Sequence, residues 1–175
     1  FIQDAIQTLG QVDLLVNNAS TFAKSDAATV STEDIQNTIM INSIAPFLLM
    51  QNLYQDCKSK GYNAHVINLT DTQVEKDESP YFSYLMSKKL LSDISRFTAL
   101  DWADHLRVNM IAPGWILDAK DSPSPHRHIP MNRQGKLEDI SDAVLYLDGQ
   151  DYISGQTIYA GGADQLQACI GSRHV

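Results

Sequence analysis

Short apolar runs alternate with longer segments of helical periodicity along this chain, and the alternation constrains the fold more than any other feature. Residues 12–16, 65–69 and 107–112 are mainly apolar, a pattern typical of parallel strands buried on both faces. A shorter run at 156–159 is expected to form the last strand. Helices are expected around these strands, at residues 1–9, 31–58, 82–103 and 137–147. This order predicts an α/β fold with a parallel sheet and right-handed crossovers.

Composition narrows the classes of partner. The 175 residues carry a net charge of -8, which argues against a broad nucleic-acid interface and against attraction to acidic membranes. No apolar run approaches the ~20 residues that a membrane span needs. Cys57 and Cys169 are too few and too far apart for a disulfide framework, so a cytoplasmic location is expected. His126 and His128 have no Cys or carboxylate pattern around them, so no metal site is predicted.

Small polar segments follow three of the predicted strands, at 17–22, 70–72 and 113–117. In a parallel sheet these segments lie at one edge, where ligands of α/β proteins bind. The next helix starts near that edge and carries Tyr84 and Lys88 one turn apart. An ammonium beside a phenol favours the phenolate, which lowers the tyrosine pKa and makes the hydroxyl a usable acid. We therefore predict a catalytic site at this edge of the sheet.

Two further features bear on that site. Asn42 and Pro46 fall inside the expected helix at 31–58. Because proline removes a helical hydrogen bond, Asn42 is expected where the backbone departs from regularity. The segment 117–135 is polar and proline-rich, and a loop of this length in a compact domain is typical of a lid.

Five motifs in order make the chain similar to the short-chain dehydrogenase/reductase family over residues 11–162. They are Asn17-Asn18-Ala19, Asn42, the Tyr84 and Lys88 pair, Asn109 to Gly114, and Ser154-Gly155-Gln156 with Gly161-Gly162. The resemblance implies a Rossmann-like, doubly wound sheet and a nicotinamide-dependent reductase. It implies catalytic roles for Asn42, Tyr84 and Lys88, together with the residue at position 71.

The same resemblance implies the cofactor contacts. They are Asn18, Ala19, Ser20, Leu69, Tyr84, Lys88, Pro113, Gly114 and Ile116. NADPH is the expected cofactor, with NADH left open. The family's glycine-rich turn after its first strand has no counterpart, and Phe1 falls after the family's third strand. Residues 1–175 are therefore expected to be the C-terminal portion of a single reductase domain.

Asp71 departs from the family pattern, which usually has Ser thirteen residues before the Tyr. A carboxylate only accepts hydrogen bonds, so it suits a ring with N–H groups better than a ketone oxygen. The run from Asn18 to Phe22 resembles the Asn-Ala-Ser-x-Phe of pteridine reductases, and dihydromonapterin reductases also carry Asp at this position. The resemblance implies a dihydropterin substrate of dihydromonapterin, dihydrobiopterin or dihydrofolate type. Its expected contacts are Ser20, Phe22, Asp71, Tyr84 and Trp115.

In the expected mechanism Tyr84 donates a proton, Lys88 lowers its pKa and holds the ribose, and Asn42 fixes a water. Two alternatives stay open. In a shifted register Thr70 or Thr72 would supply the hydroxyl of a general ketone or alcohol oxidoreductase. A truncated, non-catalytic paralogue would bind pterin without turnover. The resemblance also implies a homotetramer or homodimer, formed through the helices at 31–58 and 82–103.

Overall fold

The computed structural model describes residues 2–75, 80–117 and 129–169. Four strands form one parallel sheet in the order β1-β2-β3-β4. They are β1 (Leu14–Asn17), β2 (Ala64–Leu69), β3 (Leu106–Pro113) and β4 (Thr157–Ala160). The α-helices are α1 (Ile2–Leu9), α2 (Thr32–Ile39), α3 (Ala45–Lys60), α4 (Phe82–Asp101) and α5 (Leu137–Asp148). The predicted α/β fold with a parallel, doubly wound sheet is confirmed.

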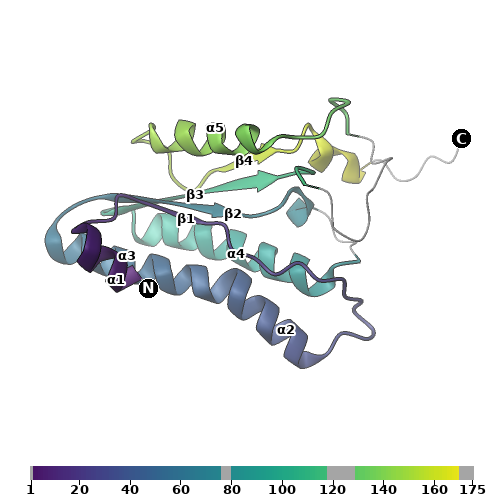
Figure 1. Ribbon diagram of the computed structural model, residues 1–175, viewed down its shortest axis with the longest axis horizontal. Coiled ribbons are helices and arrows are strands. Elements are labelled where there is room, and N and C mark those ends of the chain that lie inside the picture. Colours follow the sequence, from purple (N-terminus) through teal and green to yellow (C-terminus); the bar gives the residue numbers. More distant parts are fainter. Residues whose placement is uncertain (1, 76–79, 118–128, 170–175) are drawn as a thin grey trace, which may run out of the picture.

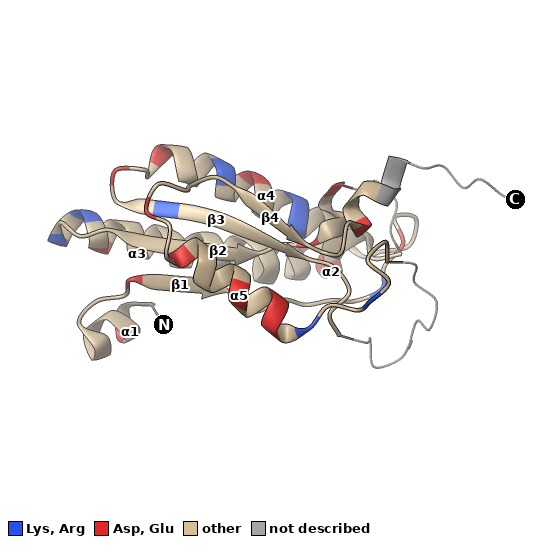
Figure 2. Ribbon diagram, turned by 90° about the horizontal axis from the view of Figure 1, so that it is seen from above, with Lys and Arg blue, Asp and Glu red and all other residues tan. Residues whose placement is uncertain are grey.

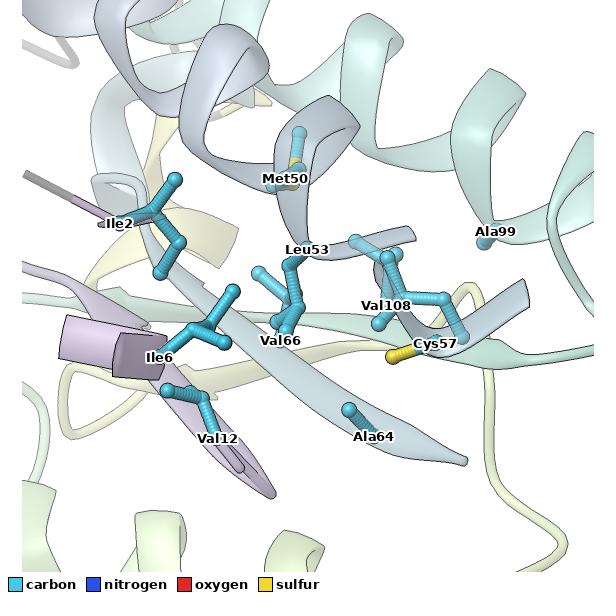
Figure 3. Packing of buried hydrophobic residues seen from close by; sticks show 11 residues of the cluster. Ile2, Ile6, Val12, Met50, Leu53, Cys57, Ala64, Val66, Ala99 and Val108 are labelled. Atoms are coloured by element: carbon cyan, nitrogen blue, oxygen red, sulfur yellow. The ribbon is translucent and has the colours of Figure 1, made fainter. Parts of the chain in front are cut away.

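Helices cover both faces of the sheet: α1, α3 and α4 lie on one side and α5 on the other (Figure 1). Every residue of β2 is buried, because this central strand has a helical layer on each face. The larger apolar cluster lies under α1 and α3, where Ile6, Leu53 and Val66 point toward one another (Figure 3). The smaller cluster joins β2 and β3 to α5.

The expected helix at 31–58 is interrupted as predicted, but by a π-helical turn at Met40–Ile44. Pro46 lies two residues after this turn, at the start of α3, and the Ala45 N–H donates to the Met40 carbonyl oxygen in the π pattern. The backbone stays helical from α2 through the π turn into α3, so the proline falls within a helix that is locally widened. The wider π turn buries Asn42 and Ser43, and such turns are frequent at functional sites.

Part of the predicted lid, residues 118–128 with His126 and His128, lies outside the described residues. Its described end is bonded to the segment that follows β3, since the Gly135 N–H donates to the Trp115 carbonyl oxygen at 3.0 Å. Among the described helices, none has the length and apolar character needed to cross a membrane.

Candidate active site

A cavity of about 460 Å³ opens at the carboxyl ends of β1, β2 and β3. The segments after three different strands meet there, as the parallel topology predicts. Most of the predicted site residues line it: Asn18, Ser20, Phe22, Leu69, Asp71, Tyr84, Lys88, Pro113, Gly114, Trp115 and Ile116. Ala19 lies in the same turn, exposed, and Asn42 is buried beside it; neither belongs to the lining. The lining also includes Thr70, Gln73, Tyr81 and Leu117.

Asp71 and Tyr84 are in direct contact. The Tyr84 hydroxyl donates to Asp71 Oδ2 at 2.8 Å, and the Gln73 N–H donates to Asp71 Oδ1 at 2.7 Å. The second bond is an Asx-type turn that starts a 3₁₀ helix at Thr72–Glu75. Each carboxylate oxygen thus has a fixed neighbour, and the carboxylate is held at the cavity wall.

The shifted register expected as an alternative is not what the structure has. The Thr70 hydroxyl donates to the Ile111 carbonyl oxygen at 3.1 Å, within the sheet. Thr72 is buried and does not belong to the cavity lining. The partner of Tyr84 in this structure is therefore Asp71.

The pKa of Tyr84 moves opposite to the direction predicted from its spacing to Lys88. Burial raises the pKa of the Tyr84 phenol, and the negative charge of Asp71 raises it further. The Lys88 ammonium lies 5.7 Å from the Tyr84 ring centroid and donates instead to the Leu69 carbonyl oxygen at 2.7 Å. Burial lowers the pKa of Lys88 to about 8, partly offset by Asp71. In this arrangement the proton stays on Tyr84 and points at Asp71.

Asn42 holds the turn after β1 against helix α4. Its Oδ1 accepts from the Thr21 N–H at 2.8 Å, and its Nδ2 donates to the Thr21 carbonyl oxygen at 3.0 Å. Nδ2 also donates to Ser87 Oγ at 2.9 Å, and Ser87 in turn donates to the Tyr84 carbonyl oxygen. The described bonds make Asn42 a positioning residue between Thr21 and Tyr84, and the water-holding role expected for it stays a prediction.

Three aromatic rings form a corner of the cavity. The Phe22 ring stacks on Tyr81 at a centroid distance of 4.1 Å and an interplanar angle of 17°. It meets Tyr84 edge to face, at 4.6 Å and 85°. No stacking role was predicted for Tyr81 from the sequence. The available signal was an aromatic residue directly before the expected helix, three residues from Tyr84.

A protein family described as enoyl-(acyl carrier protein) reductase matches residues 1–162 of the chain. The 7alpha-hydroxysteroid dehydrogenase of Escherichia coli (strain K12) is 32% identical, over 93% of this chain and 68% of that protein. Glucose 1-dehydrogenase from Gluconobacter oxydans (strain 621H) is 29% identical, over 92% of this chain and 65% of that protein. The chain thus spans about two thirds of the length of these relatives.

Solved structures with the same arrangement include two oxidoreductases. FolM Alternative dihydrofolate reductase 1 from Brucella canis, complexed with NADP, has a TM-score of 0.87 and 27% identity, covering 94% of this chain and 68% of that one. Acetoin dehydrogenase YohF from Salmonella typhimurium has a TM-score of 0.85 and 28% identity, covering 94% of this chain and 69% of that one.

Proposed function

Because the chain belongs to the short-chain dehydrogenase/reductase family of NAD(P)-dependent oxidoreductases, we propose that it is part of an NADPH-dependent dihydropterin reductase. The observation that carries the proposal is the hydrogen bond from Tyr84 to Asp71. An ionised carboxylate accepts N–H groups and has no proton to offer a ketone oxygen. The Brucella neighbour, complexed with NADP, supports both the cofactor and the substrate class.

The residues around the cavity fit a nicotinamide cofactor. Asn18 and Ser20 on one side, with Pro113 and Ile116 on the other, would hold its nicotinamide end. An ammonium has three N–H donors, and Lys88 uses one on Leu69, so further donors can reach ribose hydroxyls. When bound, NADPH supplies the hydride.

The proton comes from this chain. The raised pKa keeps Tyr84 protonated at neutral pH but makes its hydroxyl a weaker acid, so the charge of Lys88 is needed to stabilise the phenolate as the proton leaves. Asp71 orients the N–H groups of the pterin ring and relays the proton toward the ring nitrogen. With a pKa of about 8, Lys88 is charged at neutral pH and stabilises the phenolate that forms after transfer.

Phe22 gives the flat substrate a surface to stack on. Its ring is 49% exposed beside the cavity, and Tyr81 covers one of its faces. The stack stiffens Phe22, and a stiff aromatic surface suits a flat heterocycle such as a pterin.

Assembly and location complete the proposal. We expect a homodimer or homotetramer formed through the α2–α3 segment and α4. These elements expose large apolar side chains, namely Met40, Ile41, Leu48, Met86, Leu90, Phe97 and Leu100. We place the protein in the cytoplasm, where the free, buried Cys57 would stay reduced. Light scattering on the purified protein measures the assembly state.

A second candidate, general ketone or alcohol oxidation and reduction, is favoured by relatives named for glucose, 7alpha-hydroxysteroids and acetoin. NADPH oxidation across dihydropterins and ketones decides between them. For pterin reduction we expect Tyr84→Phe to abolish turnover while NADPH binding is retained. Binding of pterin without turnover in the unmodified protein would instead support a non-catalytic pterin-binding protein.

A further inference from the structure

A second cavity, of about 250 Å³, has Trp115 in its lining. Among the described residues, Trp115 is the one that also lines the first cavity, so the two cavities lie on either side of this residue or meet at it. We call the second cavity the side compartment. Its walls include the apolar side chains of Ile129 and Met131, the polar side chains of Arg133 and Tyr159, and the backbone of Gly162.

The side compartment is fixed to the main cavity by backbone contacts. The Gly135 N–H donates to the Trp115 carbonyl oxygen, and Gln134 Nε2 donates to the Ile116 carbonyl oxygen at 3.0 Å. Gly162 has a φ of +61°, and a Cβ there would lie 2.7 Å from the Ile129 side chain. At Gly162 the wall of the side compartment is therefore backbone packed directly against the Ile129 side chain. These contacts fix the position of the side compartment relative to the first cavity.

Arg133, the cationic side chain among the described residues of the side compartment, is already paired. Arg133 holds Asp139 through two hydrogen bonds, of 2.7 and 3.1 Å. The Tyr159 hydroxyl is hydrogen-bonded to the Glu75 carboxylate. Glu138 and Asp139 stand in the first turn of α5, and Figure 2 shows further acidic segments along that helix. A ligand reaching this compartment meets a paired guanidinium with carboxylates beside it.

We propose that the side compartment receives the substituent of the pterin ring and selects a neutral, hydroxyl-bearing substituent over one that ends in carboxylates. The inference rests on the proposed function, since it extends the same site past Trp115. A hydroxyl can donate to Asp139 and accept from the remaining N–H groups of Arg133. A carboxylate on the substituent would be repelled by the acidic side chains of α5. The Arg133 guanidinium, which could otherwise attract it, is already paired with Asp139.

The test compares three substrates: an unsubstituted dihydropterin, one with a short polyhydroxylated side chain, and dihydrofolate, which ends in carboxylates. Met131→Trp places a larger ring in the wall of the side compartment. Because the Met131 side chain is 61% exposed, the substitution should not disturb the fold. We expect the KM of the polyhydroxylated substrate to rise about tenfold more than that of the unsubstituted one, the equivalent of losing a modest contact. Leu145→Trp is the control, because Leu145 is 69% exposed and lines neither cavity.

A charge variant tests the selectivity. In Asp139→Asn the amide oxygen can still accept from the Lys136 N–H, while Arg133 loses its charged partner. We expect kcat/KM for dihydrofolate to rise several-fold relative to the polyhydroxylated substrate. Equal KM changes for all substrates in Met131→Trp, or a preference of the unmodified protein for dihydrofolate, would overturn the inference. Failure to bind or reduce even the unsubstituted dihydropterin would instead refute the proposed function, and the inference with it.

Discussion

Replacing Lys88 by Met should abolish catalysis without making the protein less stable. Lys88 is 3% exposed, and burial lowers its pKa from 10.5 to about 8. At 1.36 kcal/mol per pKa unit, burying the ammonium destabilises the folded state by about 3 kcal/mol at neutral pH. Lys88→Met removes this penalty but leaves the Leu69 carbonyl without its donor, which costs about 1–3 kcal/mol. The two effects nearly offset, so we expect a free energy of unfolding equal to that of the unmodified protein or up to about 2 kcal/mol higher.

The pH dependence of the free energy of unfolding distinguishes the removal of a buried charge from a substitution without electrostatic effect. The folded-state pKa of Lys88 is the lower one, so between about pH 8 and pH 10.5 the unfolded chain binds more protons. The free energy of unfolding should therefore rise with pH across that interval, and the rise should be smaller in Lys88→Met. Urea unfolding of both proteins at several pH values gives the difference. A variant that is clearly less stable at neutral pH, or an identical slope in both proteins, would refute the argument.

Three further perturbations have clear expected outcomes. Burial lowers the pKa of His65 to about 4, so the free energy of unfolding should decrease by up to about 3 kcal/mol as pH falls from 6.5 toward 4. In thermal unfolding, the stability of His65→Gln should depend less on pH over that range. A Cβ at the buried Gly161 would lie 2.5 Å from the Thr72 side chain, so Gly161→Ala should lower the free energy of unfolding by about 1–3 kcal/mol in denaturant titration. Gly149→Ala, with no contact nearer than 3.5 Å, is its matched control. Asn42→Ala should lower kcat about tenfold and also weaken NADPH binding, since it frees the turn after β1 that carries Asn18, Ser20 and Phe22; an unchanged kcat would contradict this positioning role.

The fold was largely predictable because apolar runs and helical periodicity report burial directly. The strands at 65–69 and 107–112 were placed to within a residue or two of β2 and β3. The irregular backbone at Asn42 was also predicted, and in the structure it takes the form of a π turn within a continuous helix. Proline in a sequence marks an irregularity, and tertiary packing decides the form that it takes.

The site was predictable in its membership but less so in its electrostatics. The carboxyl ends of parallel strands lie at the same edge of the sheet, and helix α4 starts near that edge. This is why Asp71 and Tyr84 were expected together. The direction of the Tyr84 pKa depends on burial and on where Lys88 aims its ammonium, and residue spacing records neither. The stacking of Tyr81 on Phe22 depends in the same way on side-chain rotamers.

Asp71 is proposed to direct the acid Tyr84 toward a ring nitrogen, and its replacement by serine separates this role from ketone reduction. The kcat/KM for a dihydropterin and for a ketone is measured in the unmodified protein and in Asp71→Ser. We expect the substitution to lower pterin reduction about a hundredfold, while ketone reduction stays the same or rises, because a serine hydroxyl can donate to a carbonyl oxygen. Unchanged pterin reduction in Asp71→Ser would show that Asp71 does not direct the proton of Tyr84.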